Sequence, residues 1–200
     1  MSSQTRKYAL KARAEKQAET RRRIVAATSA LHEAVGPART TVAEIARRAG
    51  VQRLTVYNNF PDDQALFEAC GAHWTTENPL PDPTAALARE NPAERLRGVV
   101  GPLYGWYRRT ARANENFLRD RLVLPALDAV MRIRRDREFD NLADALAAGF
   151  TPTTAPAKDV RAAVALALDF WTWRRLTGEG MSDDDAAELM VNAVGSAVRT

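Results

Sequence analysis

Hydroxyl, amide, phenol and guanidinium side chains are concentrated in one short segment of the chain, residues 53–59. At about 100° per residue, Val56 and Phe60 share a helix face that can pack inward. The side chains left toward solvent or DNA are Arg53, Leu54, Thr55, Tyr57, Asn58 and Asn59. Arg suits guanine, Asn and Gln suit adenine, and Thr and Tyr suit phosphate oxygens. The segment therefore has the side chains of a helix that hydrogen-bonds base edges and phosphates.

The residues just before this helix predict a helix-turn-helix. Residues 41–44 (Thr-Val-Ala-Glu) have the pattern of a capping box, in which Thr41 accepts from a first-turn amide and Glu44 reaches back. A short helix follows, with Ile45 and Ala46 on its inner face, and closes at Gly50. The turn at residues 49–52 has the length and the glycine of a helix-turn-helix connection.

The charge of the chain is unevenly distributed. Residues 1–60 hold 12 Lys and Arg against four Asp and Glu, whereas residues 61–200 hold 17 against 21. A basic segment joined to a larger acidic one suggests contact with a polyanion at the N-terminal end. A solvated basic tail explains the charge by itself about equally well.

The whole chain is predicted to be all-α, with about nine helices, because apolar residues recur at helical spacing and hardly ever alternate. The first helix covers about 17–35, and residues 1–16 either fray or extend it backwards. Further helices are expected over about 62–74, 91–113, 114–150 with a kink or break at Pro125, 157–177, and from Ser182 onward. Three prolines in residues 78–83 mark a linker. The predicted division is a basic arm (1–16), a helix-turn-helix domain (17–60), a connecting helix (61–76) and a C-terminal domain (77–200).

The runs 41–51 and 55–61, followed by Ala65, Leu66 and Phe67, resemble the DNA-binding domain of the TetR family of bacterial transcriptional repressors. The Ile-Ala, Ala-Gly-Val and Thr-Val-Tyr-x-x-Phe elements occur in register over residues 20–70. The resemblance implies a three-helix N-terminal domain with its helix-turn-helix, a connecting fourth helix, and a C-terminal domain for ligand sensing and dimerisation.

The same resemblance assigns roles at the DNA surface. It implies phosphate contacts for Thr40, Thr41, Tyr57 and Asn59, and base contacts for Gln52, Arg53, Leu54 and Asn58. Two residues depart from the family pattern. Gln52 stands where the family often has a Ser helix cap, so it is expected to reach DNA instead of capping. Asp63 stands where a Lys often contacts phosphate, so that contact has to come from a neighbouring amide at the helix start.

An aromatic-rich set in the C-terminal part is the predicted ligand pocket. Its members are Tyr104, Trp106, Tyr107, Phe117, Met131, Phe170 and Trp171, with Trp173 nearby. Asn116, Asp128 and Asp169 are polar groups that could orient a ligand there. Plain core packing is the competing explanation, since aromatic residues at helical spacing are more often core.

Small and aliphatic residues recur at i, i+3, i+4 and i+7 on the last two helices. They are Ala162, Leu166 and Asp169 on one, and Ala186, Leu189, Met190, Ala193, Val194 and Ala197 on the other. Family resemblance makes this set the interface of a homodimer. An internal bundle face is the alternative.

Residues for enzyme chemistry are not evident. His32 and His73 have no partner at the spacing of a zinc pair, and Cys70 lies on an expected core face. The sequence has no glycine-rich phosphate loop and no nucleophile elbow. We therefore expect no metal and no cofactor.

The sequence predicts a DNA-binding transcriptional regulator, a repressor released from a palindromic double-stranded DNA operator by an apolar or aromatic small-molecule effector. A ligand-blind architectural DNA-binding protein and an all-helical enzyme are the alternatives. The chain lacks a run of about 18 apolar residues, and Met1 to Lys16 contain no apolar segment. Neither a membrane span nor a signal peptide is expected, and the expected location is the cytoplasm.

Overall fold

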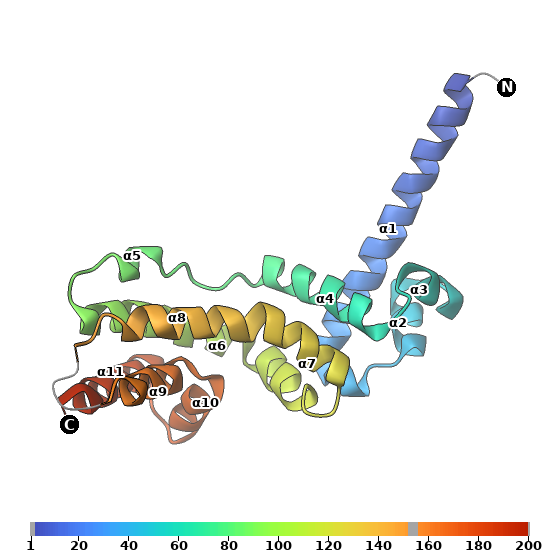
Figure 1. The fold of residues 1–200 in the computed structure, drawn as a ribbon. Helices are drawn as coiled ribbons and strands as arrows, with labels where there is room; N and C mark the ends of the chain where they lie inside the picture. Colours follow the sequence, from blue (N-terminus) through green and yellow to red (C-terminus); the bar gives the residue numbers. More distant parts are fainter. Residues whose placement is uncertain (1–2, 152–155, 200) are drawn as a thin grey trace. The chain divides into compact units, whose positions relative to one another are not determined.

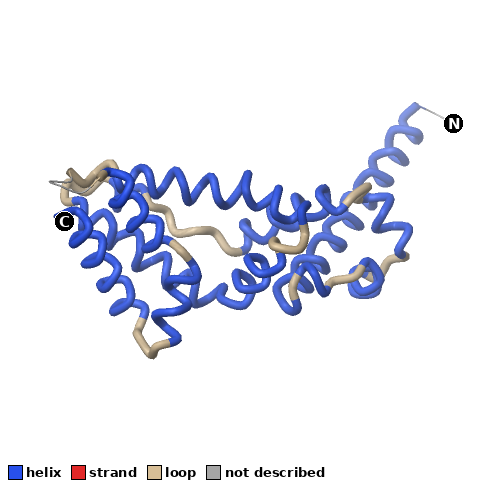
Figure 2. The backbone as a smooth tube through the Cα atoms, turned by 60° about the horizontal axis from the view of Figure 1, so that its bottom comes forward, coloured by secondary structure: helices blue, strands red, loops and turns tan. Residues whose placement is uncertain are grey.

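A computed structural model describes residues 3–151 and 156–199 of the chain. Helices and loops make up these residues, and no strand occurs among them (Figure 2). The predicted all-α class is confirmed. The elements, labelled in Figure 1, are α1 (Ser3–Val35), the 3-10 turn η1 (Pro37–Arg39), α2 (Val42–Ala49), α3 (Arg53–Asn59), α4 (Asp63–Glu77), α5 (Thr84–Leu87), α6 (Pro92–Asp120), α7 (Pro125–Met131), the π-helical turn η2 (Arg132–Asp136), α8 (Arg137–Ala147), α9 (Ala157–Leu168), α10 (Phe170–Gly178) and α11 (Asp183–Arg199).

The chain divides into two compact units. Unit 1 comprises residues 1–78 and 115–130, and unit 2 comprises residues 79–114 and 131–200. The division after residue 78 lies close to the predicted one after residue 76. Residues 115–130, in contrast, group with the N-terminal helices, so α6 contributes residues to both units.

Unit 1 is built around an apolar core shared by α1 to α4. Ile24, Ala27 and Leu31 follow one another at helical spacing on the inward face of α1. The residues that they meet in this core are Ile45, Ala46, Ala49, Val56, Phe60, Leu66 and Cys70. Val56 and Phe60 hold α3 against the core, so the opposite face of this helix points outward.

The end of α1 is held by residues far along the chain. Gly36 stops the helix with a φ of 95°, a conformation that favours glycine. The Asn116 amide donates to the carbonyl oxygens of His32 (3.4 Å) and Glu33 (2.9 Å). The buried Asp120 carboxylate accepts from the amide of Ala38 at 2.9 Å. These bonds satisfy backbone groups that a helix end leaves open.

Unit 2 has its own core, in which α6 packs with the C-terminal helices. Tyr104 and Tyr107 of α6 are fully buried, and their hydroxyls donate to the carbonyl oxygens of Ala167 (3.0 Å) and Leu168 (2.6 Å). Phe170 lies edge-on to Tyr107, with ring centroids 5.2 Å apart. The two hydroxyls therefore meet carbonyl groups at the end of α9.

Several predicted helix boundaries were wrong. The helix predicted for residues 157–177 is broken at Asp169, whose carboxylate accepts from the Thr172 amide at 2.8 Å and caps α10. A side chain that competes in this way for backbone amides interrupts a helix that apolar spacing alone would continue. The stretch predicted for 114–150 does break before Pro125, which is one of the two predicted alternatives, but it also contains the π-helical turn at residues 132–136, which was not predicted.

Other helices are longer than the sequence indicated. α1 begins at Ser3, so the alternative in which residues 3–16 extend the first helix is the one observed. α4 continues to Glu77 instead of Trp74, and α6 continues to Asp120 instead of Ala113. The short α5 directly follows the proline-rich linker and was not predicted. These ends depend on packing within each unit, which local signals do not report.

Candidate functional site

The helix-turn-helix of unit 1 is set by local signals. Thr41 caps α2, because its hydroxyl accepts from the Glu44 amide at 3.2 Å. Glu44 does not complete the predicted capping box and instead forms an ion pair with Arg47 (Nε to Oε2, 3.0 Å), which lowers the pKa of the Glu44 carboxyl. Gly50 ends α2 in the left-handed conformation, with φ 65° and ψ 40°. The turn that follows leads directly into α3.

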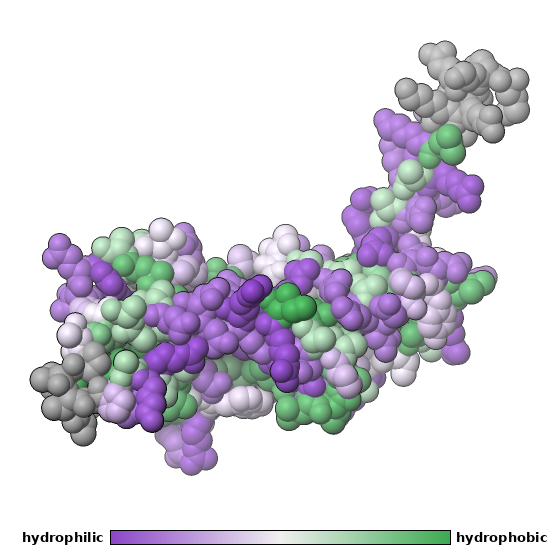
Figure 3. Space-filling model, viewed as in Figure 1, coloured by the Kyte–Doolittle hydropathy of each residue, from purple (hydrophilic) through white to green (hydrophobic). Residues whose placement is uncertain are grey.

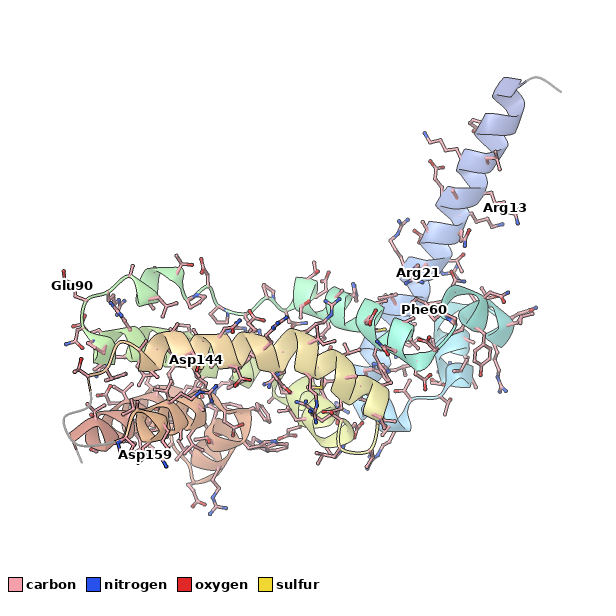
Figure 4. The ribbon with its side chains drawn as sticks, in the orientation of Figure 1. Arg13, Arg21, Phe60, Glu90, Asp144 and Asp159 are labelled. Atoms are coloured by element: carbon pink, nitrogen blue, oxygen red, sulfur yellow. The ribbon has the colours of Figure 1, made fainter. Side chains whose placement is uncertain are left out.

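Two arginines of α1 tie this turn and α3 to the first helix. The Arg23 guanidinium donates to the carbonyl oxygens of Ala49 and, at 3.0 Å, of Gly50. The Arg21 guanidinium donates to the Asn59 carbonyl at 2.6 Å and lies 4.0 Å from the centroid of the Phe60 ring (Figure 4). Neither contact was predicted from the sequence, although three consecutive arginines before the first core residue indicate a basic group at this position.

The outer face of α3 carries the predicted base-contacting residues. Val56 and Phe60 are only 2% and 3% exposed, as the helical spacing predicts. Leu54 and Tyr57, by contrast, are 65% and 56% exposed. The residues exposed at the start of this helix and along its outer face are Gln52, Arg53, Leu54, Tyr57 and Asn58. They form one continuous surface of mixed hydrogen-bonding and apolar groups.

Other predicted DNA-contacting residues are partly used within the fold. Thr40 is half-buried, and its hydroxyl donates to the Gly36 carbonyl at 2.8 Å. Asn59 and Thr55 are half-buried, and the Asn59 amide donates to the Thr55 carbonyl at 2.7 Å. Thr41 is exposed beside its cap. Within unit 1, these groups lie at the ends of the helix-turn-helix elements.

The two departures from the family pattern have a structural counterpart. Gln52 occupies the N-cap position of α3, yet its side chain makes no capping hydrogen bond and is exposed. Asp63 is exposed in the first turn of α4, where Asp62 caps the helix by accepting from the Ala65 amide at 2.7 Å. The first turn of α4 thus holds two carboxylates where a phosphate contact is common in the family.

The aromatic residues predicted to bind a ligand belong to both units. Phe117 belongs to unit 1, where its ring lies edge-on to that of Trp74, with centroids 5.4 Å apart. Six belong to unit 2, namely Tyr104, Trp106, Tyr107, Met131, Phe170 and Trp171. All of these six except Trp171 are buried. Trp173, which was placed beside the set, packs against Phe170 and Tyr107 with its ring tilted by 42° to each, and its indole nitrogen donates to Asp183 at 2.8 Å.

Unit 2 also contains an open, mainly apolar groove of about 270 Å³ that the sequence analysis missed. It is lined by the linker and α5 (Leu80, Pro81, Asp82, Pro83, Leu87), by α6 (Gly98, Val99, Leu103) and by α8 (Glu138, Phe139, Asn141, Leu142, Ala145). None of the seven predicted ligand residues lines it. Its polar side chains are two carboxylates and one amide, and no Lys or Arg contributes to the lining.

The three polar residues considered as ligand-orienting groups have structural partners. Asn116 bonds to carbonyl groups at the end of α1, and Asp169 caps α10. Asp128 accepts from Arg121 at 2.8 Å (Nε to Oδ1). The contacts of these side chains therefore support the interpretation that they cap helices and form ion pairs.

The predicted interface residues on α9 and α11 fall into three groups by exposure. Leu166 and Leu189 are 57% and 45% exposed, and Ala162 and Ala193 are exposed as well. Ala186 and Val194 are fully buried in the core of their own unit. The partly exposed residues are Asp169, Met190 and Ala197. An apolar outer face therefore remains on these helices, next to Trp171, which is 47% exposed.

His32 and Cys70 lie in the core of unit 1. Burial lowers the pKa of His32 to about 4, against an opposing effect of the Asp120 carboxylate. Burial raises the pKa of the Cys70 thiol to about 12. Among the described residues, no group of three or more His, Cys, Asp and Glu side chains could hold a metal ion. None of the helices in residues 3–151 and 156–199 has the length and apolar character needed to cross a bilayer.

Comparison with known proteins gives a family match over the helix-turn-helix region. Residues 24–70 match the family described as "Bacterial regulatory proteins, tetR family". The match covers the part of α1 that lies in the core, then η1, α2, α3 and the first half of α4. No curated protein matches the chain.

Solved structures match nearly the whole chain in fold. NalD of Pseudomonas aeruginosa, the secondary repressor of the MexAB-OprM multidrug efflux pump, has a TM-score of 0.62 at 18% identity, over 92% of this chain and 97% of its own. A TetR-like transcriptional regulator from Rhodococcus sp. RHA1 has a TM-score of 0.59 at 19% identity, over 88% and 93% of the two chains. A tetR-family regulator from Streptomyces coelicolor has a TM-score of 0.58 at 18% identity, over 90% and 80%. Residues 24–70 of this chain therefore match the tetR family of bacterial regulatory proteins, and the chain as a whole has the fold of the TetR-family transcriptional regulators that it resembles.

Proposed function

We propose that the protein is a homodimeric transcriptional repressor that leaves a palindromic DNA operator when a small molecule binds its C-terminal unit. The observation that carries the proposal is the outer face of α3. A buried Val56 and Phe60 hold the helix, while Arg53, Tyr57 and Asn58 are exposed. Guanidinium and amide groups on such a face can each make paired hydrogen bonds to base edges in the major groove.

Binding to DNA is tested with three variants on two duplexes. One duplex carries the site that the wild-type protein selects from a randomised library, and the other carries the same bases in scrambled order. Tyr57→Ala should weaken binding to both, because a phosphate contact carries no sequence information. Arg53→Ala and Asn58→Ala should lose about 1 to 3 kcal/mol on the selected site and much less on the scrambled one. Equal losses on both duplexes for all three variants contradict these roles.

A dimer is proposed because one seven-residue helix reads too few base pairs for useful selectivity. Two-fold symmetry places two such helices about 34 to 36 Å apart, in successive major grooves on one side of the duplex. The exposed apolar residues of α9 and α11 are the surface that we assign to the second subunit. Ala162, Leu166, Leu189 and Ala193 would lie at its centre, and small side chains there permit close approach of helices.

The groove of unit 2 is the position that we propose for the effector. Its walls are largely apolar, and Asp82, Glu138 and Asn141 supply hydrogen-bond acceptors. An apolar or aromatic molecule that carries a donor or a positive charge fits this lining.

Helix α6 is the proposed connection between effector and DNA. It lines the groove with Gly98, Val99 and Leu103, and its last turns hold the end of α1 through Asn116 and Asp120. A ligand that favours one position of α6 can change DNA affinity only by its differential affinity for the two states. A coupling of about 1 to 3 kcal/mol is ordinary for such a switch.

The effector position is tested by filling the groove. A compound found by thermal shift in a library of apolar amines should lose affinity when Leu142→Trp occupies the space. Phe170→Leu changes the packed aromatic cluster. It should lower the stability of the protein but leave the compound's affinity unchanged. The reverse result would place the ligand in the aromatic cluster that the sequence indicated. The coupling must also be reciprocal. The factor by which the compound lowers the protein's affinity for DNA must equal the factor by which DNA carrying the selected site lowers its affinity for the compound.

A further inference from the structure

We propose that the N-terminal part of α1, residues 3–20, is a second DNA-binding element that lies along the phosphate backbone of the duplex flanking each half-site. The proposal rests on DNA binding by the helix-turn-helix. It adds a contact that the matched domain does not include, because the family match begins at residue 24. We call residues 3–20 the N-terminal arm.

Where its side chains are described, at residues 8 and 10–19, the arm is a helix that packs against no other element of unit 1. α1 is 33 residues long and continues past the other helices of this unit as one rod (Figure 1). The side chains of Tyr8, Leu10 and residues 11–19 are exposed, and the first buried residue of α1 is Ile24. A helix that is polar all around buries no apolar stripe and gains no stability from packing. Because the arm does not pack within unit 1, its side chains are available to contact another molecule.

The charge of the arm selects a polyanion as that molecule. Residues 3–20 hold five Lys and Arg against two Glu, and three more arginines follow at residues 21–23. Glu15 and Glu19 lie near Lys11 (3.9 Å) and Arg22 (Nε to Oε2, 3.1 Å), and the remaining charge is in excess. The surface of the arm is mainly hydrophilic with small apolar areas (Figure 3), and Tyr8 and Leu10 are its large exposed apolar side chains. A mainly polar arm suits phosphates better than the acyl boundary of a membrane, which binds helices by a broad buried apolar side.

The base of the arm lies beside α3, the helix proposed to contact the DNA bases. Arg21, at its base, donates to the carbonyl of Asn59, the last residue of α3. Arg13 lies about two turns farther out on the same helix (Figure 4). At 1.5 Å per residue the arm spans about 27 Å, which equals about 8 base pairs of B-form DNA. A duplex seated on α3 and extended beyond the half-site therefore offers phosphates over a comparable length.

The salt dependence of binding tests the charge of the arm. A variant with Lys11, Arg13 and Lys16 each changed to Gln removes three charges and no core contact. Its matched control changes Arg109, Arg134 and Arg137 to Gln, three exposed basic residues of unit 2. Each lost phosphate contact lowers the log-log salt slope by about 0.9, so the arm variant should lose about 2.7 per subunit. Between about 50 and 200 mM salt, that difference equals about a 40-fold change in relative affinity.

The length of the duplex tests the position of the arm. The wild-type protein should bind the selected site more tightly when each end is extended by about ten base pairs, whereas the arm variant should gain little. The control variant should behave as wild type in both experiments. Circular dichroism and thermal unfolding establish that all three proteins are folded.

The outcomes separate this inference from the proposed function. If the wild-type protein selects no DNA site, the proposed function fails. If it selects a site, and the arm variant keeps the wild-type slope and the wild-type gain from longer flanks, the inference about the arm is overturned. If the arm variant loses affinity for anionic phosphatidylserine vesicles but not for DNA, a membrane surface is the partner and the inference is likewise overturned.

Discussion

Buried ionisable residues of unit 1 illustrate how position changes chemistry at the residue scale. His32 lies in the core, where its ring packs against that of Phe67 with centroids 5.6 Å apart. Cys70 lies in the same core and is also buried. Burial disfavours the charged form of each side chain, so the imidazole stays neutral and the thiol stays protonated at neutral pH. Both residues therefore contribute to packing, and neither is set up as a base or a nucleophile.

His32 predicts a loss of stability in mild acid. Its pKa is about 4 in the folded chain and 6.5 in the unfolded one, so the unfolded state binds more protons between these values. The stabilisation is present above pH 6.5 and is lost as the pH falls toward 4. Between pH 7 and pH 5 the free energy of unfolding should fall by about 2 kcal/mol more in the wild type than in His32→Gln. Urea unfolding at the two pH values measures this, and an equal fall in both proteins contradicts it.

Cys70 predicts slow chemical labelling of the folded protein. A pKa of about 12 in place of 9.0 reduces the thiolate fraction at pH 8 about 1000-fold. We expect a disulfide reagent such as dithionitrobenzoate to react at least that much more slowly with the native protein than with the protein in denaturant. Prompt reaction of the native protein would mean that Cys70 is exposed.

At the element scale, turns and caps decide how the helices of unit 1 meet. Arg21 and Arg23 hold the turn and the end of α3, and Thr41 starts α2. The end of α1 depends on Gly36, whose φ of 95° allows the chain to turn beside the Asp120 carboxylate. The position of the recognition helix is therefore set by contacts at the ends of helices as well as by the core.

Two glycines make a matched test of this dependence. At Gly36 a Cβ would have a strained φ and would overlap the Asp120 carboxylate and the Arg119 guanidinium. Gly36→Ala should therefore lower the free energy of unfolding by about 1 to 3 kcal/mol. Gly71, inside α4, has no atom within 4 Å of such a Cβ, so Gly71→Ala should raise it by about 0.5 to 1 kcal/mol. Denaturant unfolding of both variants measures the pair, and changes of the same sign contradict the assignment.

At the scale of the whole molecule, the proposed function gives the two units separate tasks. Unit 1 presents the exposed face of α3, and unit 2 presents the groove and the apolar outer face of α9 and α11. The proposed repressor requires both, since two recognition helices must be held at a fixed spacing.

The proposed dimer makes one further prediction. Leu189→Asp would place a carboxylate in an apolar interface without a partner, and should yield monomers. Leu122→Asp is the matched control, since Leu122 is 83% exposed and belongs to unit 1. Sedimentation velocity distinguishes the two species. If Leu189→Asp remains dimeric, the interface lies elsewhere.

Local sequence signals determined much of the helix-turn-helix. The cap at Thr41, the left-handed Gly50 and the inward register of Val56 and Phe60 all follow from residues within one or two turns of each other. Signals of this kind can be recognised without knowledge of the fold, because the groups that interact are neighbours in the chain. For that reason the all-α class and the outward face of α3 could be predicted.

Tertiary structure alone decided which distant groups meet. Arg21 bonds to a carbonyl 38 residues away, and Asn116 to one 83 residues away. The groove draws its lining from three separate segments between Leu80 and Ala145, so no single stretch of sequence indicates it. Aromatic residues at helical spacing could equally line a pocket or fill a core. Packing within unit 2 placed Tyr104 and Phe170 in that core, because burying large apolar surfaces outweighs any local preference.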